Sequence, residues 1–167
     1  VVLKRNEIQL TGNLAEAEIY AVPYGDDGMI SGGVIDLPGF YGSGIGGKGE
    51  SSTTEDVENL INKLQIQGID GLVLDLRRNG GGLLNEAIAL TGLFIPKGPV
   101  VQIRDTNGSI RKDWDKDPKV AYEGPLVVLV SRRSASASEI VAGALQNHGR
   151  ALIVGDSATH GKGTVQA

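Results

Sequence analysis

Two short apolar runs, each followed by a helical pattern, constrain the fold of this chain more than any other feature. Residues 71–76 read GLVLDL and residues 126–130 read LVVLV. Continuous apolar runs of this length are typical of strands that are buried on both faces. Helical patterns follow them at residues 84–94 and 137–146. This alternation predicts an α/β fold with a largely parallel sheet covered by helices.

The N-terminal part of the chain has a different character. Residues 1–38 predict a β-rich segment, with apolar stretches between Gly, Asn and Asp turn signals at 1–10, 17–22 and 29–37. Residues 41–53 are rich in glycine and serine and predict a loop, which could also serve as a lid. A helix is expected after Ser52, with one apolar face formed by Val57, Leu60, Ile61 and Leu64.

Three further elements complete the predicted order. A hairpin is expected from residues 100–104 and 110–112 around an Asn107-Gly108 turn, with a solvated end at residues 113–115. A strand is predicted at residues 151–154, and a last one begins at Thr164. The sequence has no internal repeat that would indicate a solenoid.

Length and composition indicate one domain over residues 1–167, since 167 residues with 40% hydrophobic content can form one core. A net charge of −4 without a basic cluster argues against nucleic-acid binding. The absence of cysteine excludes disulfides and thiolate metal sites, and no apolar run is long enough for a membrane span. The chain lacks an initial Met and ends where a strand is predicted to continue, so we interpret it as an excerpt of a longer protein.

The motif SASASE at residues 134–139 is the strongest chemical signal. It lies between the apolar run 126–130 and a predicted helix, so Ser136 would stand at a helix N-terminus. Unpaired N–H groups there, with that of Ala137 as the natural donor, would stabilise an anion on an attacked carbonyl. Ser136 is therefore the candidate nucleophile. The competing interpretation is a capping box between Ser136 and Glu139, and capping and catalysis could also be divided between Ser134, Ser136 and Ser138.

Lys162, in the motif GKGTVQ at residues 161–166, is the candidate general base. A lysine becomes a base when burial lowers the pKa of its amine, and the flanking glycines predict a backbone packed tightly around the side chain. Gln166 could orient the amine through its amide oxygen. A regular strand would separate the Cα atoms of Lys162 and Gln166 by roughly 13 Å, so either a bend at Gly163 or two long side chains that lean together is expected. Alone, a Gly-Lys-Gly sequence most often forms a turn.

The glycine turn at residues 80–82 is a second candidate for oxyanion donors, because glycine allows close approach of the backbone to a ligand. Residues 155–162 only imitate a Walker A loop, with one residue too many and Gly163 in place of Ser or Thr, which argues against nucleotide binding. A Ser-His-Asp triad using His148 or His160 with Asp75 or Asp156 ranks below the Ser/Lys pair. Neither histidine has a partner at metal-ligand spacing, so no metal site is predicted.

These motifs together resemble the carboxy-terminal processing, or tail-specific, serine proteases of bacteria and chloroplasts. The resemblance also includes VIDLPGFY at 34–41, DLR at 75–77, GLFIP at 92–96 and GPLVVLV at 124–130. It implies Ser136 as nucleophile, Lys162 as general base and Gln166 as its orienting partner. It implies an oxyanion hole formed by the N–H groups of Ala137 and Gly82, and a fold like that of the Clp protease and crotonase enzymes.

The same resemblance implies partners and a location. Proteases of this kind act on unfolded or tailed proteins whose apolar C-terminus is captured by an upstream PDZ domain, and no PDZ domain is present in these 167 residues. They need no cofactor and usually work in the periplasm or cell envelope. The resemblance also implies further sheet after residue 167, so the isolated core is expected to be inactive.

Two functions of other classes stay open. One is a non-catalytic module of the same fold that binds apolar ligands, against which the joint presence of Ser136, Lys162 and Gln166 argues. The other is an acyl-CoA enzyme of the crotonase type, which would place coenzyme A at residues 80–82. The sequence shows no basic pocket for the phosphates of coenzyme A.

Overall fold

The structure is a computed structural model that describes residues 14–25, 28–42 and 52–164. The strand predicted at residues 1–10, most of the 41–53 loop, and Gln166 lie outside this part of the chain. Thr164, where a last strand was predicted to begin, is described without strand structure, and the residues after it also lie outside.

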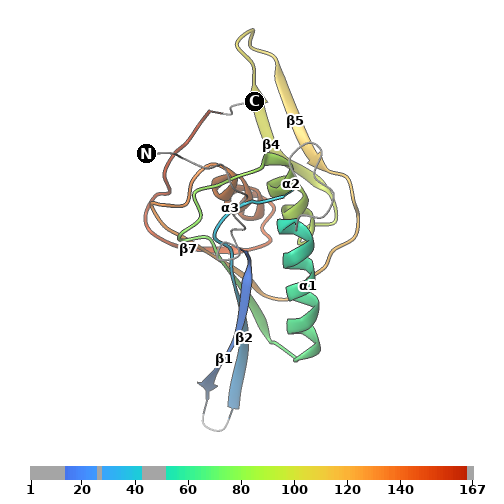
Figure 1. Cartoon of the computed structure of the whole chain (residues 1–167), viewed down its shortest axis with the longest axis vertical. Helices are drawn as coiled ribbons and strands as arrows, with labels where there is room; N and C mark the ends of the chain where they lie inside the picture. Colours follow the sequence, from blue (N-terminus) through green and yellow to red (C-terminus); the bar gives the residue numbers. More distant parts are fainter. Residues whose placement is uncertain (1–13, 26–27, 43–51, 165–167) are drawn as a thin grey trace, which may run out of the picture.

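A five-stranded sheet in the order β1-β2-β3-β6-β7 forms the centre of the fold (Figure 1). β1 (Glu16–Tyr24) pairs antiparallel with β2 (Gly28–Asp36). The other pairings are parallel. β2 pairs with β3 (Gly71–Asp75), β3 with β6 (Leu126–Val130), and β6 with β7 (Leu152–Gly155). The predicted α/β class, with a largely parallel sheet and a β-rich N-terminal segment, is confirmed.

Three helices make the crossovers between the parallel strands. α1 (Thr53–Ile66) leads to β3, α2 (Leu84–Gly92) leads toward β6, and α3 (Ala137–Asn147) leads to β7. Because the parallel strands follow one another across the sheet in chain order, right-handed crossovers place all three helices on one face. On the other face Val73, Val127 and Leu129 remain half-buried among the described residues.

The core lies between the helices and the covered face of the sheet. Ile35, Leu72, Leu74 and Val128 of the strands are at most 1% exposed, and helical side chains pack against them. The predicted apolar face of α1 is confirmed at Val57, Ile61 and Leu64, while Leu60 is only partly buried. Ser52 caps α1 by accepting a hydrogen bond from Glu55 N–H at 3.5 Å.

The predicted hairpin is present as the two-stranded sheet of β4 (Gly98–Arg104) and β5 (Ile110–Asp115), which projects from the body (Figure 1). The expectation of a solvated end at residues 113–115 is confirmed at Trp114, which is exposed, and is wrong at Asp115. β5 continues through Asp115, whose carboxylate is buried against the backbone of Gly92. No helix in the part of the chain described here is long and apolar enough to cross a membrane.

Candidate active site

Four loops meet at the carboxyl ends of the parallel strands, and they carry Ser136, Gly82 and Lys162, with Ala137 at the start of the helix that follows. Residues 37–42 follow β2, residues 76–83 follow β3, residues 131–136 follow β6, and residues 156–162 follow β7. The carboxyl ends of parallel strands lie at the same edge of a sheet, which is where open α/β folds bind their ligands. The topology therefore brings the serine, glycine and lysine motifs to one place.

Ser136 lies at the N-cap of α3 in an unusual backbone conformation. Its φ of 56° and ψ of −115° make it the only described non-glycine residue with a positive φ. Such a conformation costs about 1–3 kcal/mol and persists only where the surroundings impose it, most often at functional sites. A sharp strand-to-helix turn of this kind holds a serine hydroxyl away from the helix and toward the open edge of a sheet. Ser136 is half-buried, so its hydroxyl is within reach of solvent.

The other two serines of the motif have structural partners. Ser134 is fully buried, donates its hydroxyl to the Leu76 carbonyl at 2.7 Å and accepts from Ser131 N–H at 2.9 Å. Ser138 is also fully buried and donates to the Asn79 carbonyl at 2.9 Å. The three serines therefore divide their roles, with Ser134 and Ser138 fixing the turn that presents Ser136.

Ser136 and Glu139 also have the arrangement of a capping box, as the alternative interpretation expected. The close hydrogen bonds join Ser136 N–H to Glu139 Oε2 at 2.8 Å and Glu139 N–H to the Ser136 carbonyl at 2.9 Å. The Ser136 hydroxyl faces Glu139 N–H in this box, but that N–H makes its hydrogen bond to the Ser136 carbonyl and not to the hydroxyl. Helix capping by Glu139 thus leaves the hydroxyl available for chemistry.

The glycine turn packs directly against the serine turn. A Cβ added to Gly81 would lie 2.8 Å from Ser136 Cβ and 2.8 Å from the Ala135 carbonyl oxygen, so only glycine fits there. The Gly81 carbonyl accepts from Phe40 N–H at 3.0 Å. The peptide bond is trans, so Gly82 N–H points the opposite way, away from Phe40.

Neither Gly82 N–H nor Ala137 N–H donates a hydrogen bond to another residue that the structure describes. Ala137 is the first residue of α3, where backbone donors have no partner within the helix and the dipole is positive. Two free donors beside a serine can bind a developing oxyanion.

Glu139 joins the lysine segment to the serine turn, a connection that the sequence did not indicate. Its carboxylate accepts from Thr159 Oγ1 at 2.7 Å, from Gly161 N–H at 2.6 Å and from Lys162 N–H at 3.0 Å, besides Ser136 N–H. Burial alone would raise the pKa of Glu139, but these four hydrogen bonds outweigh it and lower the pKa. In the sequence, the only signal for this residue is its spacing of three positions from Ser136, which is that of a capping box.

Lys162 has its backbone at the site and its side chain exposed. The tight backbone packing expected from the flanking glycines is not found among the described residues, where a Cβ added to Gly161 or Gly163 would meet no atom within 4 Å. Gly161 has a φ of 84°, so a turn conformation is what requires glycine there. The predicted partner Gln166 lies outside the described residues.

The competing triads do not assemble in the described residues. His148 caps the C-terminus of α3 and pairs its Nε2 with the Pro99 carbonyl at 2.9 Å. Asp156 accepts from Arg132 N–H at 2.9 Å. The backbone N–H of His160 donates to the Ser134 carbonyl at 3.0 Å, but among the described residues no hydrogen bond joins its side chain to Ser136 or to an aspartate. The part of the chain that the structure describes also holds no group of three or more acidic or His side chains that could bind a metal ion.

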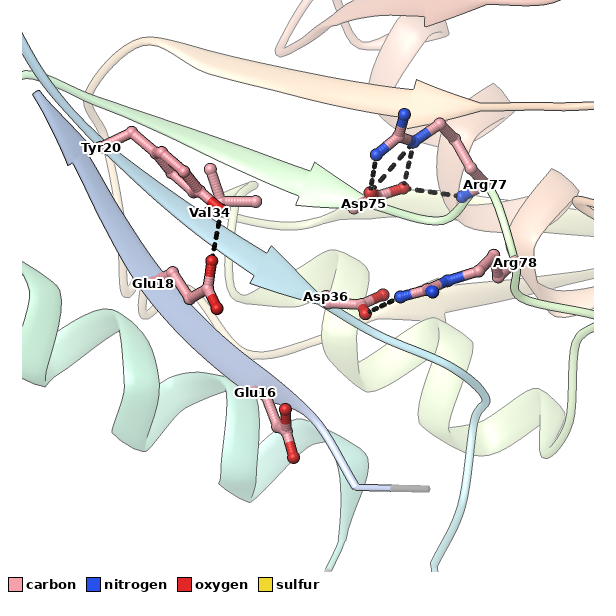
Figure 2. Close-up of a pocket in the computed structure, with 8 residues that line it drawn as sticks. All are labelled: Glu16, Glu18, Tyr20, Val34, Asp36, Asp75, Arg77 and Arg78. Atoms are coloured by element: carbon pink, nitrogen blue, oxygen red, sulfur yellow. Dashed lines mark hydrogen bonds and ion pairs between the residues drawn. The ribbon is translucent and has the colours of Figure 1, made fainter. Parts of the chain in front are cut away.

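A polar pocket lies on the sheet beside these loops (Figure 2). Glu16, Asp36 and Asp75 are neighbours across β1, β2 and β3. Their carboxylates would repel one another if two arginines did not pair with them. Arg77 binds Asp75 through two nitrogens, and Arg78 pairs with Asp36. Burial opposes ionisation of Asp75, but hydrogen bonds from Arg77 hold its pKa below the ordinary value.

Comparison with known proteins places these features in a family. The model of peptidase family S41 matches residues 31–167. The tail-specific protease of Haemophilus influenzae is 51% identical over 133 residues, which are 80% of this chain and 18% of that protein. A carboxyl-terminal-processing protease of Synechocystis is 42% identical over 113 residues, covering 68% of this chain and 26% of that protein.

Solved structures agree with this placement. The photosystem II D1 C-terminal processing protease superposes with a TM-score of 0.76 at 34% identity, covering 93% of this chain and 39% of that one. Mature CPAF, at 15% identity and a TM-score of 0.62, shows the same fold. This chain thus spans about a fifth to two fifths of the proteins it matches. The resemblance inferred from the motifs is confirmed, and the chain belongs to peptidase family S41.

Proposed function

We propose that this chain is the catalytic core of a serine endopeptidase that cleaves proteins bearing an apolar C-terminal tail. Ser136 is the nucleophile, Lys162 the general base and Gln166 the residue that orients the lysine amine. The observation that carries the proposal is the strained, half-buried Ser136 at the start of α3, packed against a glycine turn with a free N–H. Membership of family S41 supports it.

The reaction proceeds in two halves. Lys162 Nζ takes the proton of Ser136 Oγ as that oxygen attacks the scissile carbonyl, and the N–H groups of Ala137 and Gly82 bind the resulting oxyanion. The ammonium then returns the proton to the leaving amine, which gives an acyl-enzyme on Ser136. Water attacks this ester with Lys162 again as base, and release of the new carboxylate restores the serine.

The side chain of Lys162 must be neutral when Ser136 attacks. It is exposed in the structure, and desolvation is the physical means by which a lysine becomes a base. We propose that a bound polypeptide covers this amine. Proteins with unfolded or apolar tails are the proposed substrates, delivered by a PDZ domain in the parent protein, which acts in the periplasm or cell envelope.

The test is cleavage of an unfolded protein with an apolar C-terminal tail by the full-length protein. Wild type is compared with Ser136→Ala and Lys162→Ala, and with Lys116→Ala as a control for loss of a lysine elsewhere. We expect both site variants to lose cleavage by at least about 10³-fold and the control to keep it. Full cleavage by Ser136→Ala or Lys162→Ala would refute the Ser/Lys assignment.

A further inference from the structure

Asn79, in the turn between β3 and α2, is a fully buried polar residue that the proposed chemistry does not use. A buried amide is stable only where its donors and acceptors are paired. Its Nδ2 donates to the Leu37 carbonyl at 2.9 Å, and its Oδ1 accepts from Gly81 N–H at 2.8 Å. The side chain thus joins the end of β2 to the glycine turn.

The main chain of Asn79 makes contacts on the opposite side. Its carbonyl oxygen accepts from Ala135 N–H at 3.1 Å and from Ser138 Oγ at 2.9 Å. These two donors flank Ser136 and belong to the turn that presents it. One residue therefore binds both the glycine turn, which contains Gly82 N–H, and the serine turn, which contains Ala137 N–H.

The orientation of Gly82 N–H follows from this arrangement. Asn79 Oδ1 fixes Gly81 N–H, and Phe40 N–H fixes the Gly81 carbonyl, so both peptide groups of Gly81 are held. The Gly81–Gly82 peptide plane then has one orientation, with its N–H directed away from Phe40. Loss of the Asn79 amide would remove the hydrogen bond that holds Gly81 N–H.

We propose that Asn79 is the positioning residue that sets the geometry of the two oxyanion donors. This inference rests on the proposed function, because it assigns to Asn79 a role in the same site. Asn79 touches no reacting atom and acts through the peptide groups of Gly82 and Ala137. Its amide is required as both donor and acceptor, since the Leu37 carbonyl needs a donor while Gly81 N–H needs an acceptor.

Two variants separate these requirements in the full-length protein. Asn79→Ala removes both side-chain hydrogen bonds. Asn79→Asp keeps the shape and an acceptor for Gly81 N–H, but it sets a carboxylate oxygen against the Leu37 carbonyl. The matched control is Asn107→Ala, because Asn107 Oδ1 accepts from Ser109 N–H at 2.9 Å in an exposed turn of the β4–β5 hairpin.

The readouts are kcat and KM on a tailed peptide, counted per active site titrated with a fluorophosphonate, and the affinity for a peptide boronate. A boronate forms a tetrahedral, anionic adduct that uses the oxyanion donors, whereas substrate binding uses them little. We expect both Asn79 variants to lower kcat by about 10–100-fold, to change KM by less than about threefold, and to weaken boronate binding in parallel. A residue that only stabilised the fold would lower the number of titratable sites and leave kcat per site unchanged.

The inference would be overturned if both Asn79 variants had the same kcat per site and the same boronate affinity as the wild type. If neither variant folds, Ser138→Ala decides, because it removes only the hydroxyl that binds the Asn79 carbonyl. We then expect about a fivefold lower kcat at unchanged KM, and an unchanged kcat would refute the role of Asn79. Ser136→Ala in the same assay separates the two proposals. If it still cleaves, the proposed function fails. If it is inactive while the Asn79 variants match wild type, only this inference fails.

Discussion

Removal of the Glu139 carboxylate should detach the lysine segment from the serine turn. In Glu139→Ala the N–H groups of Gly161 and Lys162 and the Thr159 hydroxyl lose their acceptor. Each hydrogen bond contributes about 1 kcal/mol net, and bonds that share one acceptor are not additive. We therefore expect docking of residues 159–162 to weaken by about 2–3 kcal/mol, which corresponds to roughly a 30- to 150-fold loss of kcat/KM.

The assay is steady-state cleavage of a tailed substrate by the full-length protein, with hydrogen exchange of the Gly161 and Lys162 amides as a structural readout. Glu139→Gln keeps one oxygen acceptor and should lie between wild type and Glu139→Ala. Glu58→Gln is the control, since its ion pair with Lys119 at 2.6 Å lies on the surface, where solvent screens it, and its loss should leave cleavage unchanged. Wild-type activity together with unchanged amide protection in Glu139→Ala would refute this reasoning.

The same contact predicts a pH dependence. The pKa of Glu139 is lower in the folded protein than its ordinary value of 4.5, so the stabilisation is fully present above pH 4.5. It is lost as the pH falls through the folded pKa, because protonation removes the charge that the N–H groups bind. Protection of the two amides should therefore fall below pH 4.5 in wild type and be low at every pH in Glu139→Ala.

Three further predictions concern the turns around the site. Ser134→Ala leaves Ser131 N–H without its acceptor and the Leu76 carbonyl with Asn79 N–H as its remaining donor. It should lower the free energy of unfolding by about 1–3 kcal/mol in urea titrations while Ser136 keeps its reactivity, and unchanged stability would contradict the structural role. Gly81→Ala should lower kcat by about 100-fold, because its Cβ would displace Ser136. The control Gly108→Ala is also at positive φ but lies in open space, so it should cost about 1–2 kcal/mol of stability and no activity. Equal activity of the two variants would argue against close packing of the turns. Arg77→Ala removes the guanidinium from Asp75, which keeps the backbone N–H of residue 77 at 2.9 Å, and because the guanidinium is largely exposed the change should destabilise the fold by about 1 kcal/mol at pH 7. The lowered pKa of Asp75 makes this stabilisation vanish as the pH falls below the ordinary value of 3.8, so a difference between the unfolding free energies that persists in acid would contradict the assignment.

The periodicity of the sequence predicted most of the fold. α3, β3 and β6 lie within a residue of their expected bounds, and α1 begins directly after Ser52 as expected, because each combines a regular apolar pattern with a clear start or stop signal. The second strand of the hairpin was predicted to end at Lys112, whereas β5 extends to Asp115. Its last residues, Asp113-Trp114-Asp115, have no regular apolar pattern, and only their pairing with β4 shows that the strand continues.

The connections within the site could not be predicted in the same way. Glu139 meets Gly161 across 22 residues, and Asn79 meets Leu37 across 42 residues and Ser138 across 59. Local propensity carries no information on contacts of this kind, which depend on how the strands order in the sheet. An Asn ahead of three glycines does indicate a side-chain turn, but its burial and its second partner are tertiary properties.

Covalent labelling tests the central claim most directly. The full-length protein is treated with a fluorophosphonate, digested, and the labelled residue is located by mass spectrometry. Because Ser134 and Ser138 are fully buried and hydrogen-bonded while Ser136 stands free of the helix, we expect the label on Ser136 alone, and labelling should be lost in Lys162→Ala. A label on Ser134 or Ser138, or undiminished labelling of Ser136 without the lysine, would contradict the account.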